Sequence, residues 1–460
     1  MNPSDVVQNL INQGILVTSE MLNQIKQGTY IPQEEQEAPP IHIIENYTKP
    51  SNPRTMEDFV AHYTTRFKLI ERMLRQRPEL RNITSISRLA TQKASGNASI
   101  IGMIMDKRET ANKNIMLTLE DLSGQTKVLI SGKDEKLLEE AQNLLLDEVI
   151  GITGQAGDGI IFANEIVYPD IPYTELKKSP TEEYIAIIGD IHYGSKQFLK
   201  EEFERMIAWL NGQVGSEEQR TIASKVKYVI FIGDIIEGVG VYPSQEEDLI
   251  IKDIYDQFEG FSQYIKAIPK SKRIIICPGN HDAVRLAEPQ PPIPQDYAKT
   301  LHTLPNVSLL SNPSTFVIGK TTGFPGFTVI IYHGYSMTYF ADHIPRIRAA
   351  GGQKRADLIM KVYLQRRHLA PTQTSNQYIP DPEDDPLVIK TIPDFLITGH
   401  IHRVAIAKYK SVTMVNGSCW TGMTENQIKR GLENQPGRLP LINLSTREVT
   451  VINFHKEEHE

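Results

Sequence analysis

Side chains that can bind metal ions follow five apolar runs of this sequence. The first run, 184–188, is followed by Gly189, by Asp190 and, two residues later, by His192. Ligands of open α/β sheets bind beyond the carboxyl ends of the strands, so these residues stand where chemistry is expected. Because a parallel sheet brings its carboxyl ends to one edge, we expect the side chains after all five runs to converge. The candidate ligands are Asp190, His192, Asp234, Asn280, His333, His400 and His402.

This set of donors predicts a particular kind of metal site. Nitrogen and oxygen donors without thiolates suit Mn²⁺, Fe or Zn²⁺. Seven donors are too many for one ion that must also bind water and substrate, so we expect two ions. Two ions roughly 3.5–4 Å apart favour phosphoester hydrolysis, because they lower the pKa of water and hold both the attacking and the leaving oxygen. A single histidine of the set would be as well explained by hydrogen bonding in the core. Glycines beside the ligands would let the backbone approach closely: Gly189, Gly233, Gly279, Gly334 and Gly399.

The fold class that could position these ligands is α/β. From Pro180 onward, apolar strands alternate with helical segments, which is typical of a layered α/β domain over residues 180–460. Residues 80–172 contain five short strand-like runs with one helical segment, Asp134–Leu146, between the third and the fourth. That order favours an OB-fold β-barrel. Because few aromatic residues in it could stack on bases, we favour a structural or protein-docking barrel over one that binds single strands. The runs lie near Ser99–Ile104, Ile115–Leu119, Lys127–Ile130, Glu148–Thr153 and Ile160–Val167.

Three shorter segments precede the barrel. Residues 1–30 predict a small N-terminal helical module, suited to docking or to a dimer contact. Residues 31–55 are rich in proline and glutamate and predict a flexible linker. Residues 56–79 predict a connecting helix, whose aromatic stripe belongs to a core and which Pro78 ends.

Composition limits the class of protein. A chain of 460 residues has room for two or three domains, and a formal net charge of −7 gives no general attraction to nucleic acid or membrane. No apolar run is long enough to span a bilayer, and the first residues lack a signal peptide, so we expect a soluble, cytoplasmic protein. Cys277 and Cys419 are too few for a disulfide framework and are expected to be small buried hydrophobes.

The five motifs resemble those of the calcineurin-like metallophosphoesterase superfamily. Gly-Asp-x-His, Gly-Asp, Gly-Asn-His-Asp, His-Gly and Gly-His-x-His occur in that order. The resemblance implies one metal held by Asp190, His192 and His402. It implies a second metal held by Asn280, His333 and His400, with Asp234 bridging the two. His281 would be a non-ligand histidine that protonates the leaving oxygen, and Asp282 would orient it.

The substrate has to be inferred from other parts of the chain. Residues 341–370 carry seven Lys or Arg and two Asp in an otherwise acidic protein. A basic patch beside a phosphoesterase site could guide a nucleic-acid backbone, and we take Arg346, Arg348, Arg366 and Arg367 as candidate contacts. The alternative is a solvated helix face that packs its apolar side inward.

A barrel before a phosphoesterase domain resembles the small subunits of archaeal family D DNA polymerases. The similarity covers roughly residues 80–460 and extends to Gly102–Thr110, Glu288–Pro291 and Arg366–Pro371. It implies a 3′–5′ proofreading exonuclease that uses Mn²⁺ and acts on the primer 3′ end. It also implies a scaffold for a large catalytic subunit, in a heterodimer or heterotetramer, with the sliding clamp as a further partner. The setting would be an archaeal cytoplasm, at the nucleoid during replication.

Two other functions remain open from the sequence: a catalytically silent scaffold, and a free-standing metallophosphatase or nucleotidase. One departure from the family pattern bears on substrate contacts and not on the metals. After His333 and Gly334 the chain continues with Tyr335-Ser-Met-Thr-Tyr, where relatives often carry a basic residue and then acidic ones.

Overall fold

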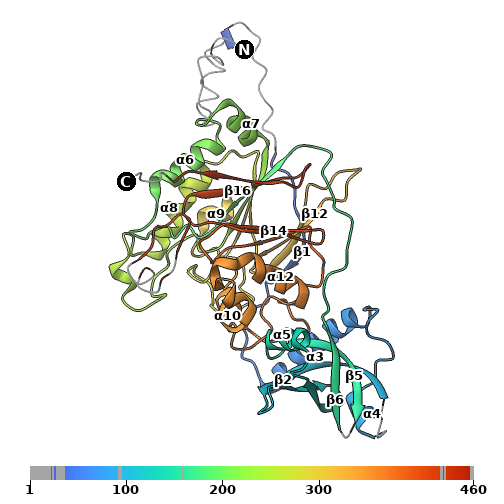
Figure 1. The fold of residues 1–460 in the computed structure, drawn as a ribbon. Coiled ribbons are helices and arrows are strands. Elements are labelled where there is room, and N and C mark those ends of the chain that lie inside the picture. Colours follow the sequence, from blue (N-terminus) through green and yellow to red (C-terminus); the bar gives the residue numbers. More distant parts are fainter. Residues whose placement is uncertain are drawn as a thin grey trace.

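The computed structural model describes residues 37–455, apart from 92–95, 158, 425–427, 429–430 and 432, together with residues 22, 25 and 26. The helical module predicted for residues 1–30 therefore lies almost entirely outside the described residues. A larger body of sheets and helices adjoins a smaller barrel (Figure 1). Within the described chain, no helix is both long enough and apolar enough to cross a membrane.

Two six-stranded sheets form the larger body. The strand order of one is β10-β9-β8-β7-β16-β17, and that of the other is β1-β11-β12-β13-β15-β14. The first contains β7 (Tyr184–Ile188), β8 (Val226–Ile232), β9 (Arg273–Cys277), β10 (Val307–Leu309), β16 (Arg438–Asn443) and β17 (Val449–Asn453). The second contains β1 (His42–Asn46), β11 (Ser314–Ile318), β12 (Phe327–Tyr332), β13 (Phe395–Thr398), β14 (Ala405–Tyr409) and β15 (Val412–Asn416).

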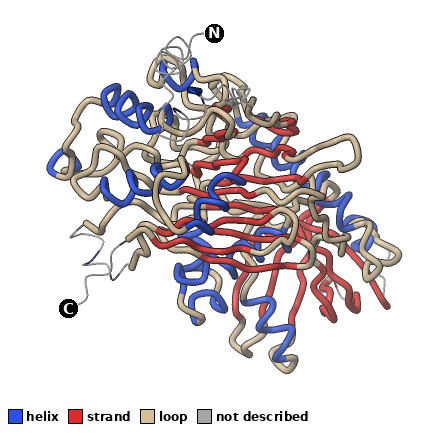
Figure 2. Tube along the Cα trace, turned by 90° about the horizontal axis from the view of Figure 1, so that it is seen from above, coloured by secondary structure: helices blue, strands red, loops and turns tan. Residues whose placement is uncertain are grey.

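The sheets pack face to face, with helices on both outer faces. β7 illustrates the cause, since all five of its residues are buried and successive side chains point to opposite faces. Ile185 and Ile187 pack between the sheets, whereas Ala186 and Ile188 pack toward helices. Figure 2 shows strands crossing the middle of the molecule with helices around them. On the β7 side lie α6 (Lys200–Leu210), α7 (Glu217–Lys225), α8 (Ile254–Lys266) and α9 (Lys299–Thr303). On the β12 side lie α10 (Met337–His343), α11 (Pro345–Ala349), η2 (Gly352–Arg355) and α12 (Ala356–Arg366).

The predicted α/β class is therefore observed, with one correction. The sequence led us to expect one parallel sheet under all five motifs. Instead, β7, β8 and β9 are parallel neighbours in one sheet, while β12 and β13 are parallel neighbours in the other. Continuous apolar strands show burial on both faces but do not say which sheet a strand joins.

The smaller body is a closed barrel of five strands in the order β2-β3-β4-β6-β5. β2 (Gly96–Glu109) is long enough to pair with β3 (Ile115–Asp121) and also with β5 (Val149–Gly157), which closes the barrel. β4 (Gly124–Ile130) and β6 (Ile160–Val167) complete it. The predicted helical segment is α5 (Glu135–Gln142), between β4 and β5, and Asp134 caps it by accepting a hydrogen bond from Leu137 N.

The connecting helix is α3 (Met56–Leu74), and a short helix, α4 (Ile86–Thr91), follows it. Thr55 and Asp58 form a capping box at the start of α3. Phe67 and Ile70 of α3 pack against the barrel through Ile101, so the aromatic stripe does reach a core. The start of the helix does not, because Met56 is 74% exposed.

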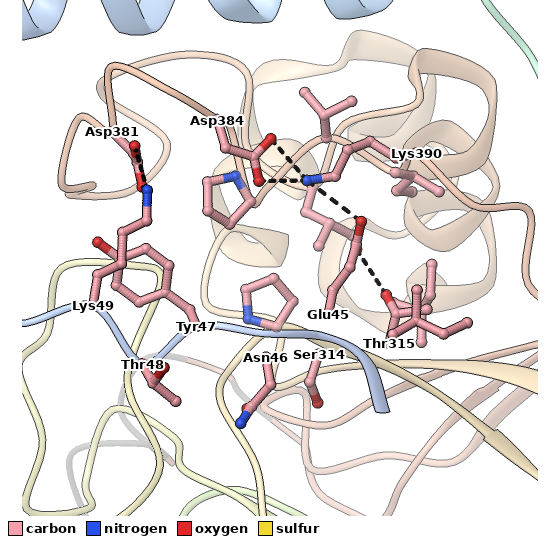
Figure 3. Close-up of a pocket in the computed structure, with 17 residues that line it drawn as sticks. Glu45, Asn46, Tyr47, Thr48, Lys49, Ser314, Thr315, Asp381, Asp384 and Lys390 are labelled. Carbon is pink, nitrogen blue, oxygen red and sulfur yellow. Dashed lines mark hydrogen bonds and ion pairs between the residues drawn. The ribbon is translucent and has the colours of Figure 1, made fainter. Parts of the chain in front are cut away.

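Part of the predicted flexible linker is ordered sheet. Residues His42–Asn46 form β1, which pairs antiparallel with β11. The segment also lines a cavity of about 370 Å³, where Lys49 pairs with Asp381, and Lys390 pairs with Asp384 and Glu45 (Figure 3). Proline and glutamate content suggested disorder, but a long-range strand partner and these ion pairs fix the chain here. Cys277 and Cys419 are buried free thiols, as expected.

Candidate metal centre

Backbone conformation singles out the predicted ligands. Five of the seven have a positive φ: Asp190 (51°), His192 (53°), Asp234 (48°), His400 (68°) and His402 (29°). Non-glycine residues in this region cost on the order of 1–3 kcal/mol each and persist only where the surroundings fix them. Such strain is concentrated at functional sites, and here it turns side chains at the ends of β7, β8 and β13.

Hydrogen bonds between loops hold these conformations. His192 N donates to Asp234 O at 3.0 Å, which ties the loop after β7 to the loop after β8. His400 N donates to the Asp190 carboxylate at 3.0 Å, which ties one sheet to the other. Gly399 N donates to His333 O at 2.9 Å. The carboxyl ends of strands from both sheets therefore meet in one rigid place.

The first donor group contains Asp190, His192 and His402. Its ligand atoms all lie within 4.8 Å of one another. His192 Nε2 lies 3.3 Å from His402 Nε2, and His402 Nε2 lies 3.5 Å from Asp190 Oδ1. Residues from distant parts of the sequence thus form a compact set of donors, of which Asp190 and His192 are buried and His402 is partly exposed.

The second donor group contains Asp234, His333 and His400, again within 4.8 Å of one another. Asn280 joins it, because its Oδ1 lies 3.0 Å from His333 Nε2. Asp234 Oδ2 lies 3.3 Å from His333 Nε2 and 3.9 Å from His192 Nε2, so this carboxylate stands between the two groups. All seven predicted ligands are brought together.

The donor atoms fit cations. His333 Nδ1 donates to Ile232 O at 2.8 Å, which leaves its Nε2 as the lone-pair atom of a neutral ring. That Nε2 faces two further acceptors, the oxygens of Asp234 and Asn280. Three lone pairs pointing at one another repel unless a proton or a cation lies among them. The site therefore demands positive charge, which is what a divalent ion supplies.

The pKa shifts also indicate that the site favours positive charge. Burial by itself raises the pKa of Asp234, yet neighbouring histidines, His333 first, hold it well below the usual value. Burial lowers the pKa of His333, but the Asp234 carboxylate outweighs it and raises the pKa to about 10. Burial, reinforced by the charge on His333, lowers the pKa of His400 to about 3. Without bound ions, one proton is thus held on His333 beside Asp234.

Two of the predicted glycines are needed for close approach. A Cβ on Gly279 would lie 2.3 Å from Asp234 Oδ1, and one on Gly233 would lie 2.6 Å from His333 Nδ1. No real contact is that short, so a larger residue at either position would displace a ligand.

His281 lies beside the donors, and with His192 and Glu237 it forms a third group whose possible ligand atoms lie within 4.8 Å of one another. Its ring centroid is 4.6 Å from that of His192, and its Nδ1 lies 2.8 Å from Glu237 O. Asp282 does not orient it, contrary to the sequence prediction. The Asp282 carboxylate instead accepts hydrogen bonds from the backbone N–H groups of Gly279, Ile235 and Ile236. It therefore fixes the loop and not the imidazole.

Glu237 contacts a candidate ligand, and the sequence reasoning did not single it out. It is buried, and its Oε2 lies 2.9 Å from His192 Nδ1. Its Oε1 accepts from Tyr242 OH at 3.1 Å and from Gln245 Nε2 at 3.3 Å. The available signal was its spacing, an acid three residues after Asp234 in the same loop, but a loop glutamate is more often exposed.

The four arginines predicted to contact nucleic acid separate into two pairs. Arg346 and Arg348 are exposed, but they do not line the cleft that lies beside the donor groups. Arg366 and Arg367 are buried, which corrects the prediction for them. Arg366 lies 3.2 Å from Glu148 of the barrel, and Arg367 donates to Ile389 O and Lys390 O. Their charges serve internal contacts.

Five of the seven donor residues line a cleft of about 1200 Å³, whereas Asp190 and His333 are fully buried and do not line it. Besides the histidines and Asp234, its lining includes Tyr335, Tyr339, Lys354 and Arg403. Members of both donor groups therefore face this cleft.

Comparisons with known proteins identify the family. Residues 185–405 match the family model for the DNA polymerase alpha/epsilon B-subunit. The chain is 36% identical to a DNA polymerase II small subunit of Methanothermobacter thermautotrophicus, over 84% of this chain and 77% of the relative. It is 36% identical to that of Archaeoglobus fulgidus, over 95% and 88% respectively. A similarity to asparaginyl-tRNA synthetase from Pyrococcus horikoshii has 12% identity and a TM-score of 0.17, over 18% of this chain and 21% of that one. The chain therefore belongs to the family of DNA polymerase II small subunits, the small subunits of archaeal family D DNA polymerases.

Proposed function

We propose that this chain is the 3′–5′ exonuclease of a family D polymerase and hydrolyses phosphodiesters at the primer 3′ end with two divalent ions, Mn²⁺ foremost. The observation that carries the proposal is the pair of donor groups with Asp234 between them, facing the cleft. In this proposal the two sheets are a calcineurin-like phosphoesterase domain and the five-stranded barrel is an OB fold.

The donor sets assign the metal sites. Asp190, His192 and His402 would hold one ion, and Asn280, His333 and His400 the other, with Asp234 shared. Bound there, the ions supply Lewis acidity, which lowers the pKa of water and offsets the charge of the phosphate. Fe or Zn²⁺ would fit the same donors.

The chain's own residues position the remaining chemistry. The Glu237 carboxylate accepts a hydrogen bond from His192 Nδ1 and thereby directs His192 Nε2 toward the proposed metal site. The backbone carbonyl of Glu237 accepts from His281 Nδ1, which leaves His281 Nε2 to carry a proton to the leaving 3′ oxygen. His281 N also donates to Asp234 Oδ1 at 2.8 Å, so proton donor and shared ligand are fixed to each other.

A polymerase small subunit implies a large catalytic subunit, and we propose that this chain is also its scaffold, in a heterodimer or heterotetramer. DNA is the proposed substrate, and the sliding clamp is a further proposed partner. Synthesis would come from the large subunit.

The test is degradation of a 3′-mismatched primer in Mn²⁺, by the chain alone and with its large subunit. Asp234→Ala should abolish cleavage, because both donor groups lose their shared carboxylate. Glu383→Gln, at a carboxylate whose side chain is 80% exposed and outside the cleft, is the matched control and should cleave normally. An intact primer in every reaction with the unaltered chain would leave the scaffold as the function. Faster hydrolysis of small phosphomonoesters than of oligonucleotides would favour a phosphatase instead.

A further inference from the structure

The aromatic residues after the His333 motif have no part in the metal chemistry, yet they line the same cleft. Tyr335 precedes α10, and Tyr339 and His343 lie on it one turn apart. The Tyr335 ring centroid is 5.5 Å from that of His400, so this ring adjoins the second donor group. Tyr339 and His343 stack on each other, with centroids 3.8 Å apart and planes 11° apart.

Tyr335 and His343 lie outside the core cluster under α10, whereas Tyr339 is partly buried against that cluster and also lines the cleft. α10 buries Met337, Phe340 and Ala341 in the core against the second sheet. Ser336 anchors the start of the helix by hydrogen bonds to Tyr363 OH and Leu369 O, at 2.7 Å and 2.6 Å. Tyr335 keeps 38% of its surface exposed on this rigid base. An exposed ring on a fixed support is suited to stacking on a flat ligand, because little side-chain entropy is lost on binding.

Two cations line the same cleft, and both pair with one exposed carboxylate. Lys354 Nζ lies 2.7 Å from Glu433 Oε1, and Arg403 NH1 lies 3.1 Å from Glu433 Oε2. Exposed ion pairs of this kind contribute little, so a phosphate can replace the carboxylate at small cost. Among the described residues that line the cleft, Lys354 and Arg403 are the Lys and Arg side chains. With these two cations, charge supplies a limited part of the affinity and stacking has to supply more.

We propose that Tyr335, Tyr339 and His343 form a stacking surface for the unpaired bases of a 3′-terminal single strand, while Lys354 and Arg403 contact its phosphates. The inference rests on the proposed function and names its substrate class. A base exposes its face only when it is unpaired and unstacked, so this surface selects frayed ends over duplex ends. A mismatched terminus frays more readily, and the surface would thereby favour it.

The first measurement is binding of a single strand that carries 2-aminopurine at its 3′ end, in EDTA so that no cleavage occurs. Stacking on a ring quenches 2-aminopurine fluorescence. Tyr335→Ala and Tyr339→Ala should each weaken binding roughly tenfold and reduce the quench, since stacking is worth a factor of about 5 to 150 per base. Tyr335→Phe, which keeps the ring, should restore both. Tyr255→Ala is the control, because Tyr255 is 54% exposed and lies outside the cleft lining.

The second measurement compares Mn²⁺-dependent cleavage of strands with normal or abasic 3′-terminal nucleotides. The unaltered chain should prefer normal ends by about tenfold in kcat/KM, and the two alanine variants should lose the preference. Equal cleavage of both strands by the unaltered chain would overturn the inference while leaving the exonuclease standing. If neither strand is cleaved, the proposed exonuclease activity is wrong. The 2-aminopurine quench would still show whether the stacking surface exists. Two phosphate contacts predict a salt slope of about −1.4 in log K, which Arg403→Ala should reduce by about half.

Discussion

At the scale of the residue, the site is defined by hydrogen bonds that leave lone pairs pointing inward. His192 Nδ1 donates a hydrogen bond to the Glu237 carboxylate, and His333 Nδ1 donates one to the Ile232 carbonyl. The Nε2 atom of each ring therefore faces the other donor atoms of its group. These hydrogen bonds fix the ring orientation of two candidate ligands before any ion binds, which lowers the reorganisation needed for binding.

Glu237→Ala should weaken Mn²⁺ binding roughly 10- to 100-fold, the usual effect of removing a carboxylate behind a metal-binding histidine. The physical reason is that His192 loses the partner that fixes its tautomer and ring orientation. Titration calorimetry with Mn²⁺ on the full chain measures this without any substrate. Glu237→Gln is the matched variant: its amide oxygen can still accept the Nδ1 proton, so it should retain most of the affinity.

If Glu237 has only a structural role, a different result is expected. In that case Glu237→Ala and Glu237→Gln would lower the thermal unfolding temperature in EDTA to the same extent as in Mn²⁺. The orientation role requires that the unfolding temperature differ most when Mn²⁺ is present, because only the bound state uses the His192 lone pair.

Sequence reasoning placed the seven candidate ligands at strand ends because each of the five motifs follows an apolar run and contains a glycine. It could not locate Glu237, whose role depends on the Tyr242 and Gln245 contacts that bury it. It also wrongly predicted that Arg366 contacts DNA, since the sequence alone does not show whether a basic residue on a helix faces water or a buried carboxylate such as Glu148. Burial is decided by tertiary packing, and that information is not local in the sequence.

At the scale of the element, α3 is joined to the larger body by a buried polar cluster. Arg66 Nε donates to Asp385 Oδ2 at 2.6 Å, and His368 Nε2 lies 3.0 Å from the same oxygen. His62 Nε2 lies 3.5 Å away from it, so two histidines and an arginine surround one carboxylate. All four side chains are buried. A helix predicted only as a connector is thus fixed at its middle.

This cluster predicts loss of stability in acid. Burial lowers the pKa of His368 to about 4, and although burial raises the pKa of Asp385, Arg66 and His368 hold it well below its usual value. Unfolded histidine titrates near 6.5, so the unfolded chain binds the proton first as the pH falls. The unfolding free energy should therefore decrease as the pH falls from about 6.5 toward 4, by about 2 kcal/mol at pH 5 from His368 alone. Asp385 adds a further loss below about pH 4.

Urea unfolding in EDTA at pH 7, 6 and 5 measures this effect without interference from metal release. His368→Asn removes this titrating group and should reduce the difference between pH 7 and pH 5 by about 2 kcal/mol, though its stability at pH 7 falls. Parallel curves for the variant and the unaltered chain would show that His368 does not carry the dependence.

Elements differ in how far the sequence specifies them. The barrel strands and α5 were predictable, because apolar alternation and the Asp134 cap are local signals. β1 was not, since its stability comes from pairing with β11, more than 260 residues away in the chain. The division of β7–β9 and β12–β13 between two sheets was hidden for the same reason. A strand's neighbours are set by topology, and buried strands of either sheet have the same apolar pattern.

At the scale of the whole molecule, the barrel is attached to the larger body by contacts near α12. Thr372 Oγ1 donates to Leu146 O at 2.7 Å, and Arg346 N donates to Asn143 Oδ1 at 2.9 Å. Arg366 lies 3.2 Å from the buried Glu148 carboxylate, without the alignment of a hydrogen bond, and its guanidinium stacks on Tyr168 at 3.5 Å. The charge that the sequence suggested for DNA instead holds the two bodies together.

Arg366→Met tests this attachment, because it leaves Glu148 buried without its partner, a change that costs on the order of 3–5 kcal/mol. We expect the barrel to separate from the larger body, seen as an early unfolding step and as faster proteolysis between residues 168 and 183. Arg348→Gln, at an exposed arginine nearby, should change the unfolding free energy by less than about 0.5 kcal/mol. Adding Glu148→Gln to Arg366→Met should recover part of the loss, since no buried charge then remains unpaired. A DNA contact would behave otherwise: removing it would lower the salt slope of DNA binding by about 0.7 to 0.9 and leave proteolysis unchanged.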